Sequence, residues 1–337
     1  MNTIIFTSIA LAVASTTSFA NGGSWLELDK DIASLSSTVN VAGGTEVGGL
    51  LRSSYRDGGD VGEFSFEDVM LHAGGSLEEF SWRISADLVS TGSAAGLDLN
   101  EITLDDAHVV WSYNSNVSVA WGQFKLPMFR SSSIDQESML FIDRSVLGAT
   151  YDNYDMGVSI SGSNSGLDWT LAAVNGDADP ADQESLNMFA HVDYHMGNGA
   201  NSSDGAMLAG DEMDATIGFS YMDEQDDSTD AVLGIDFAMT MGQFSLMIEL
   251  ADGDDDAVSA TLGTSPSAFT FGYLFADNME AAFRHEDRDL GDDTSKDTFG
   301  LNYYLHGHNA KWQINYIDDE SVADEVIAIG LTVGASR

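Results

Sequence analysis

Alternation of apolar side chains with polar or smaller ones, sustained over segments of about ten residues, is the feature that most constrains this sequence. It is clear in Glu79–Ser90, Ala268–Phe275 and Thr298–His306, and it recurs around Trp312 and Ile329. Because successive side chains of a strand point to opposite faces, each segment has one apolar face and one more polar face. The pattern therefore predicts an all-β protein, and no helical period is sustained over more than a few turns.

The connections between these segments are of two kinds. Some are tight, as at Gly307–Asn309 and Met241–Gln243, and others are long and acidic: Asp177–Glu184, Met222–Asp230, Asp252–Asp256 and Glu286–Asp297. We count sixteen or seventeen strands, since residues 38–56 could form one strand or two. Strands joined alternately by short turns and long loops are typical of outer-membrane barrels.

Residues 1–20 have the composition of an export signal. Ile4–Val13 is mostly apolar, and Ser18-Phe19-Ala20 places small residues at the cleavage positions. We therefore expect a signal peptide at 1–20, an N-terminal extension at 21–37 and a barrel at 38–337. No segment has 18 consecutive apolar residues, so an exported chain of this kind is either a soluble periplasmic protein or a closed transmembrane β-barrel. The absence of any domain boundary favours the barrel, because a sandwich of this length normally splits into domains.

Composition excludes several classes of function. The 337 residues carry a formal charge of −43 and contain no cysteine. Disulfide scaffolds, zinc ribbons and thiol nucleophiles are therefore excluded, and so large a negative charge disfavours nucleic acid as a partner. Aromatic residues make up 10% of the chain, in numbers suited to the girdles of a lipid-facing surface.

Six basic side chains are candidates for the lining of the pore. Since a cation facing lipid at the membrane midplane costs about 2–4 kcal/mol, they should point into the lumen. The segment Leu126–Leu147, which is polar in its middle at Ser131–Ser133, is predicted to fold inward as a constricting loop. Its cations would filter solutes by charge, or they would merely neutralise lumen carboxylates. The six are Lys125, Arg130, Arg144, Arg83, Arg52 and Arg56.

Signals for catalysis or metal binding are weak. His191 and His195 have a zinc spacing only if they lie on a helix, and this segment is predicted to be a strand. His108 with Asp105 or Asp106 could serve a hydrolase, although a structural role at a strand start fits better. The Asp252–Asp256 run offers oxygen ligands to Ca²⁺ or Mg²⁺, but no segment matches the calcium-loop motif. We therefore expect no cofactor, no metal site and no catalytic residue.

Four blocks of sequence match a known pattern in order along the chain. Leu104–Val109 is followed by Gly122–Met128, by Phe141–Ser145 and, near the C-terminus, by Gly300–Lys311. They resemble, respectively, the Asp-Ala strand opening, the Gly-Gln/Asn-Phe-Lys-x-Pro-Phe segment, the Phe-Met-Glu-Arg-like segment and the penultimate hairpin of the phosphate-selective porin O/P family. The resemblance implies a sixteen-stranded, trimeric channel of the Gram-negative outer membrane, narrowed by an inward-folded loop.

The sequence thus predicts an outer-membrane porin that passes small ions and polar solutes, with lipid, lipopolysaccharide and two further copies of the chain as partners. The constriction could favour anions such as phosphate, whereas the acidic surface attracts cations. Two alternatives are a barrel hydrolase of the protease or lipase type and a non-conducting surface adhesin.

Overall fold

The computed structural model describes residues 44–58, 61–89, 102–176, 186–223, 231–253, 262–291, 294–322 and 324–336. The expected signal peptide and N-terminal extension lie outside these residues. Residues 47–337 form one compact unit. Among the described residues, no helix is long and apolar enough to cross a membrane.

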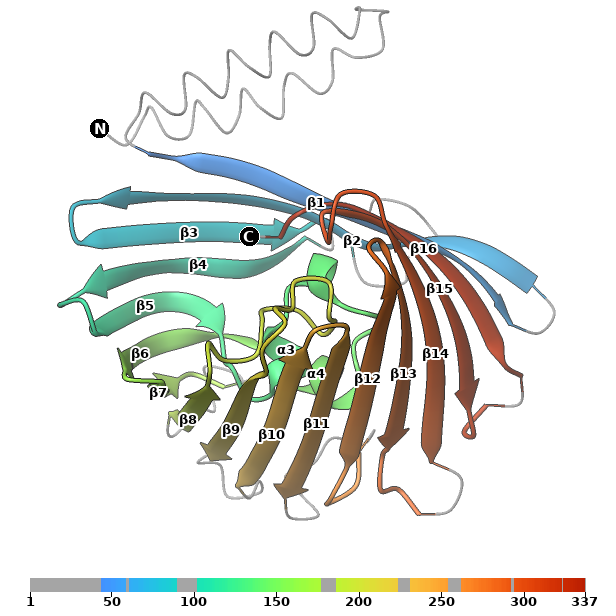
Figure 1. The fold of residues 1–337 in the computed structure, drawn as a ribbon. Coiled ribbons are helices and arrows are strands. Elements are labelled where there is room, and N and C mark those ends of the chain that lie inside the picture. Colours follow the sequence, from blue (N-terminus) through green and yellow to red (C-terminus); the bar gives the residue numbers. More distant parts are fainter. Residues whose placement is uncertain are drawn as a thin grey trace, which may run out of the picture. The chain divides into compact units, whose positions relative to one another are not determined.

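Sixteen antiparallel strands close into a barrel in which each strand pairs with its neighbours in sequence and β1 pairs with β16 (Figure 1). The prediction of an all-β barrel is confirmed, and the ambiguous stretch before residue 56 contains a single described strand. The strands are β1 Glu46–Gly58, β2 Val61–Leu77, β3 Phe80–Asp87, β4 Thr103–Ser112, β5 Val117–Lys125, β6 Tyr154–Asn164, β7 Leu167–Val174, β8 Asn187–Met196, β9 Asp214–Asp223, β10 Val232–Met241, β11 Phe244–Gly253, β12 Ser267–Ala276, β13 Met279–Asp287, β14 Ser295–Tyr304, β15 Ala310–Asp319 and β16 Val326–Gly334.

The apolar face of each alternating segment lies on the outside of the barrel. In β15, Trp312, Ile314 and Tyr316 are 44%, 45% and 40% exposed, whereas Gln313 and Asn315 between them are buried inside. Aromatic rings from neighbouring strands touch on this outer surface, as Phe283 and Phe299 do with ring centroids 4.9 Å apart. A barrel with this surface can face acyl chains, because every strand is paired and its outward side chains are apolar.

Connections alternate between the two rims, and most follow the predicted asymmetry of short turns and long loops. Two depart from it: the β1–β2 connection on the long-loop rim comprises only residues 59–60, and the β8–β9 connection on the short-turn rim runs over residues 197–213. The predicted acidic loop Glu286–Asp297 is also shorter than expected, because β13 continues to Asp287 and β14 begins at Ser295. Alternation thus located the strands more reliably than their ends.

Candidate functional site

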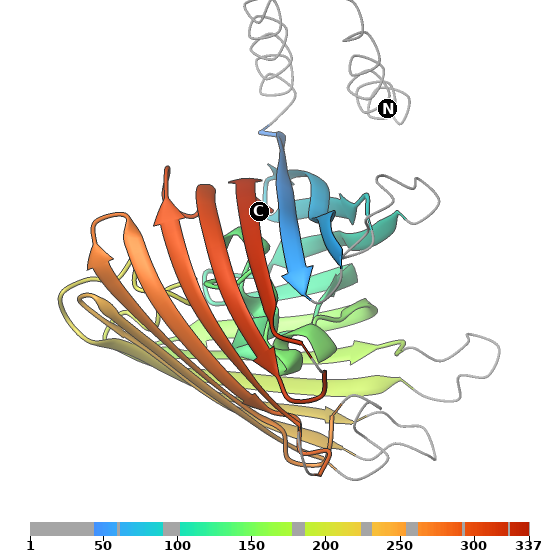
Figure 2. The same ribbon diagram turned by 90° about the vertical axis from the view of Figure 1, so that its right-hand side faces the viewer.

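The connection between β5 and β6, residues 126–153, folds into the barrel and is called here the constriction loop (Figure 2). It contains the helical turns α3 (Arg130–Ser133), η2 (Gln136–Ser138) and α4 (Val146–Thr150). The predicted segment Leu126–Leu147 ended too early, because α4 is capped by the Ser145 side chain, which accepts from the Gly148 N–H, and continues to Thr150. The structure therefore places an inward-folded loop where the sequence predicted one.

Apolar side chains of the constriction loop sit over glycines of the barrel wall. A Cβ atom built on Gly300 would lie 2.9 Å from the Phe141 ring, and one on Gly330 would lie 2.8 Å from Ile142. Leu140 in the same way lies against Gly272, and Phe129 against Gly234. Since all four loop side chains are buried, these glycines form sockets that a larger residue would fill.

Polar groups of the wall bind the backbone of the same loop. Glu249 accepts from the Ser131 N–H at 2.7 Å, and Asn315 accepts from the Ile142 N–H at 2.8 Å. The Lys311 ammonium donates to the Met139 carbonyl. Each of these wall side chains is at most 1% exposed, so the loop covers them completely. These three backbone groups of the loop are thereby satisfied by side chains of the wall.

The three predicted basic residues at the constriction loop have different partners. Lys125 forms an ion pair with Asp152, and Arg144 binds the same carboxylate at 2.8 Å. Arg144 also donates to the Ser131 carbonyl, which joins the two ends of the loop. Arg130 donates to the backbone carbonyl of Asn201, and among the described residues it has no carboxylate within 4.0 Å.

The three predicted basic residues of the wall face the lumen, and all are paired. Arg52 binds Asp68 and the Ile142 carbonyl. Arg83 binds Asp106 at 2.8 Å. Arg56 lies between two carboxylates: its Nη2 atom is 3.0 Å from Glu67 Oε1 and 2.7 Å from Asp143 Oδ1.

Asp143 is the loop partner of one of these wall cations. Burial alone raises the pKa of the Asp143 carboxyl. The hydrogen bonds and the charge of Arg56 act in the opposite direction, and together with Lys296 and Arg284 they hold that pKa below its usual value. The Arg56–Asp143 pair is therefore charged at neutral pH and ties the loop to β1.

A second inward loop, residues 197–213, meets the constriction loop from the short-turn rim. Its Asp204 accepts from the Leu140 N–H at 3.2 Å, and its Ala206 N–H donates to Glu280 at 2.7 Å. Burial raises the pKa of Asp204, and the Leu140 hydrogen bond offsets this only in part. This contact was not anticipated from the sequence, where the segment reads as an ordinary glycine- and serine-containing connection.

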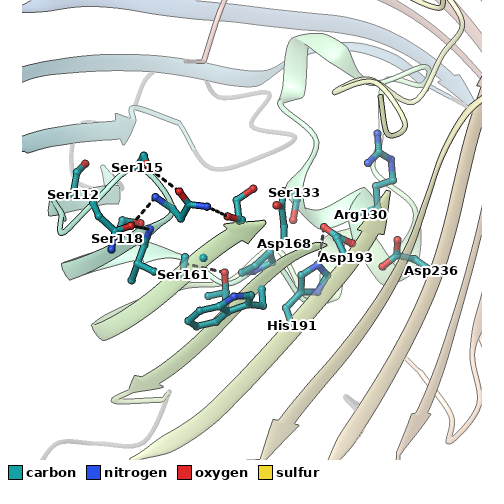
Figure 3. Close-up of a pocket in the computed structure, with 18 of the residues that line it drawn as sticks. Ser112, Ser115, Ser118, Arg130, Ser133, Ser161, Asp168, His191, Asp193 and Asp236 are labelled. Carbon is teal, nitrogen blue, oxygen red and sulfur yellow. Dashed lines mark hydrogen bonds and ion pairs between the residues drawn. The ribbon is translucent and has the colours of Figure 1, made fainter. Parts of the chain in front are cut away.

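Between the constriction loop and strands β4–β10 lies a cavity of about 520 Å³, called here the inner cavity (Figure 3). It extends from the β4–β5 turn to Pro127, Phe129 and Arg130 of the loop. Serine and threonine hydroxyls line much of its wall. Its charged and titratable side chains are Arg130, Asp168, His191, Asp193 and Asp236.

The three carboxylates of the inner cavity were not among the predicted site residues. A sequence signal for them existed: Asp236 shares the inward parity of Gly234 and Ala238 in a strand whose outward residues are Leu233 and Ile235. A charged residue in mid-strand must face the lumen whatever its sign, so the rule that selects the six cations also predicts Asp236 as a lumen residue.

The His108 cluster does not have the arrangement of a site with a serine nucleophile. The imidazole Nδ1 lies 3.1 Å from the Gln123 carbonyl and 3.5 Å from Asp106. The nearby Ser85 hydroxyl donates to Asp106 at 2.9 Å, so it is paired with the acid rather than with the base. Nucleophilic catalysis needs the hydroxyl next to the imidazole, and among the described residues no hydroxyl bonds His108.

Comparison with known structures and families agrees with this geometry. Two variants of the porin of Rhodopseudomonas blastica superpose with a TM-score of 0.59, at 14% and 13% sequence identity, over 86% of this chain and 99% of theirs. No curated protein matches the sequence. At this identity the superpositions establish the fold, that of a porin barrel.

The model of the family described as phosphate-selective porin O and P matches residues 45–251, which is more than half of the chain. The chain belongs to this family, as its motifs indicated. It is therefore an outer-membrane porin that forms a channel, and the hydrolase and adhesin alternatives have no support from the comparisons.

Proposed function

We propose that this porin is a passive channel for small hydrated solutes, and that it acts without a cofactor and without catalysing a reaction. The observation that supports this is the constriction loop, which packs on β10–β16 and leaves the inner cavity, lined by hydroxyls and carboxylates, on the other side of the lumen. A pathway of this kind excludes solutes by size and by the charge of its lining.

Of the six predicted pore residues, Arg130 is the one that acts on solutes, because it lines the inner cavity and bears no paired carboxylate among the described residues. Lys125, Arg144, Arg52, Arg56 and Arg83 hold carboxylates of the loop or the wall. Their role in this proposal is to hold the lumen in shape.

Three further expectations belong to the same proposal. The chain is exported by a signal peptide cleaved near Ala20, assembles as a homotrimer and contacts lipid and lipopolysaccharide. A further expectation is that the acidic run Asp252–Asp256 binds Ca²⁺ or Mg²⁺. Residues 254–256 of this run lie outside the described part of the chain. Within the described residues, no group of three or more metal-ligating side chains has the geometry of a metal site.

Planar-bilayer recording on the purified protein tests the proposal. We expect stepwise insertion of open channels, and a larger single-channel conductance when residues 131–150 are replaced by a short Gly-Ser linker, because the loop then no longer narrows the lumen. His108→Ala should leave conductance unchanged. A protein that inserts and passes no current, or a linker variant with the same conductance as the wild type, would contradict the proposal.

A further inference from the structure

The charge of the inner cavity differs from the charge of the predicted basic filter. Three carboxylates line it, from Asp168, Asp193 and Asp236, against the single guanidinium of Arg130. Even with His191 protonated, anionic side chains outnumber cationic ones. The other basic candidates do not alter this balance, because each is already paired with a carboxylate.

Asp236 is the least neutralised of the three carboxylates. Asp168 accepts from His195 at 3.1 Å, and Asp193 lies 3.1 Å from His191. Asp236 has neither a hydrogen bond nor an ion pair within the described part of the chain, although it is only 2% exposed and lines the cavity. Its carboxylate lies over Gly218, where a Cβ atom would be 2.3 Å from Oδ2. A buried carboxylate of this kind attracts a cation to the cavity, because no hydrogen bond or ion pair of the described residues compensates its charge.

We propose that the inner cavity makes this porin prefer cations, with Asp236 and Asp193 as the residues that determine the preference and small inorganic or organic cations as the favoured solutes. The inference rests on the proposed channel function. Hydroxyls of Ser161 and Thr170 replace part of the hydration shell of a passing cation, while the carboxylates supply the negative potential. The formal charge of −43 on the whole chain acts in the same direction at the mouths of the channel.

The reversal potential in a KCl gradient measures this preference. With Asp236→Asn, and more so with Asp193→Asn added, the ratio of potassium to chloride permeability should fall roughly twofold or more, because the lining loses charge but not volume. Arg130→Gln should raise the ratio. Asp277→Asn is the matched control: it removes an acidic charge from the β12–β13 turn on the short-turn rim, outside the cavity, and should leave the ratio unchanged.

The same recordings at about 0.1 M and about 1 M KCl should show the preference weakening as the screening length falls from about 10 Å to about 3 Å. Inorganic phosphate added to the bath should not block the potassium current. Three outcomes would overturn the inference while leaving the channel function intact. They are a wild-type reversal potential that indicates a preference for chloride, block of the potassium current by phosphate, and equal ratios of potassium to chloride permeability in the wild type and the double variant. Insertion without any current would instead overturn the channel function on which it rests.

Discussion

The two sides of the lumen use the same residue types for different purposes. On the wall covered by the constriction loop, Glu249, Glu286, Arg284 and Lys311 are at most 3% exposed, and each touches the loop or another charge. On the cavity wall, by contrast, Asp168 and Asp193 face solvent and Asp236 has no bonded partner among the described residues. A charge inside the barrel is therefore a structural anchor where it binds the loop or a neighbouring cation or anion of the covered wall, and a determinant of the potential where it lines the cavity without binding the loop.

Removing an anchor from the covered wall should have the largest effect. Arg284 binds Glu286 at 3.0 Å, donates to the Asp143 carbonyl and lies over the Phe141 ring. Arg284→Met should lower the free energy of unfolding by about 3 kcal/mol, because it leaves Glu286 buried without its closest cation. Urea unfolding in lipid vesicles, followed by tryptophan fluorescence, measures the change.

Arg288→Met is the control for this variant, since the Arg288–Asp319 pair lies near the long-loop rim with each side chain 15% exposed. Loss of this ion pair should lower the free energy of unfolding by less than about 1 kcal/mol. Equal losses in the two variants would show that contact with the constriction loop does not strengthen a charge pair of the wall.

Filling a socket should have a smaller effect, confined to the loop. In Gly300→Ala the new Cβ would lie 2.9 Å from the Phe141 ring, so the loop must shift, at a cost of about 1–2 kcal/mol. We expect a noisier single-channel current and little change in the reversal potential. Gly210→Ala, where no atom lies within 4 Å of the new Cβ, should behave as the wild type does. A Gly300→Ala channel with no more current noise than the wild type would show that packing of Phe141 over Gly300 does not fix the position of the loop.

The ion pair between Asp143 and Arg56 should contribute about 1 kcal/mol to the free energy of unfolding. The contribution is small because both side chains are roughly a quarter to a third exposed, so water screens the pair. The lowered pKa of Asp143 means that this stabilisation is fully present above the usual pKa of the carboxyl and is lost only as the pH falls through the lowered value. Asp143→Asn should therefore destabilise the protein equally at neutral and at mildly acidic pH. A penalty that vanishes on mild acidification would contradict the assignment.

Asp204 should show the opposite and smallest pH effect. Its raised pKa means that the folded protein favours the protonated carboxyl, so the cost of an ionised Asp204 applies at neutral pH and disappears as the pH falls. Asp204→Asn keeps an oxygen acceptor for the Leu140 N–H and should stabilise the contact between the two inward loops by a few tenths of a kcal/mol at neutral pH. Current noise should then decrease at neutral pH in the variant and on acidification in the wild type. Greater noise in the variant would show that the charge itself holds the contact.

Prediction from the sequence worked where the signal is local. The outward parity of Phe271, Trp312 and Ile329 follows from alternation, since the apolar face of each strand lies on the outside of the barrel. It did not anticipate the second inward loop, whose folding depends on Leu140 and Glu280, far away in the sequence.

The sequence by itself determined a closed barrel with a lipid-facing surface, because each strand repeats the same alternation and each mid-strand charge must avoid lipid. Only the tertiary structure decided which charges remain free to act on a solute. Pairs such as Arg56–Asp143 and Glu249–Ser131 join residues 87 and 118 positions apart. Whether a carboxylate is neutralised or exposed to the pore depends on where the constriction loop comes to rest, and packing against the whole wall decides that position.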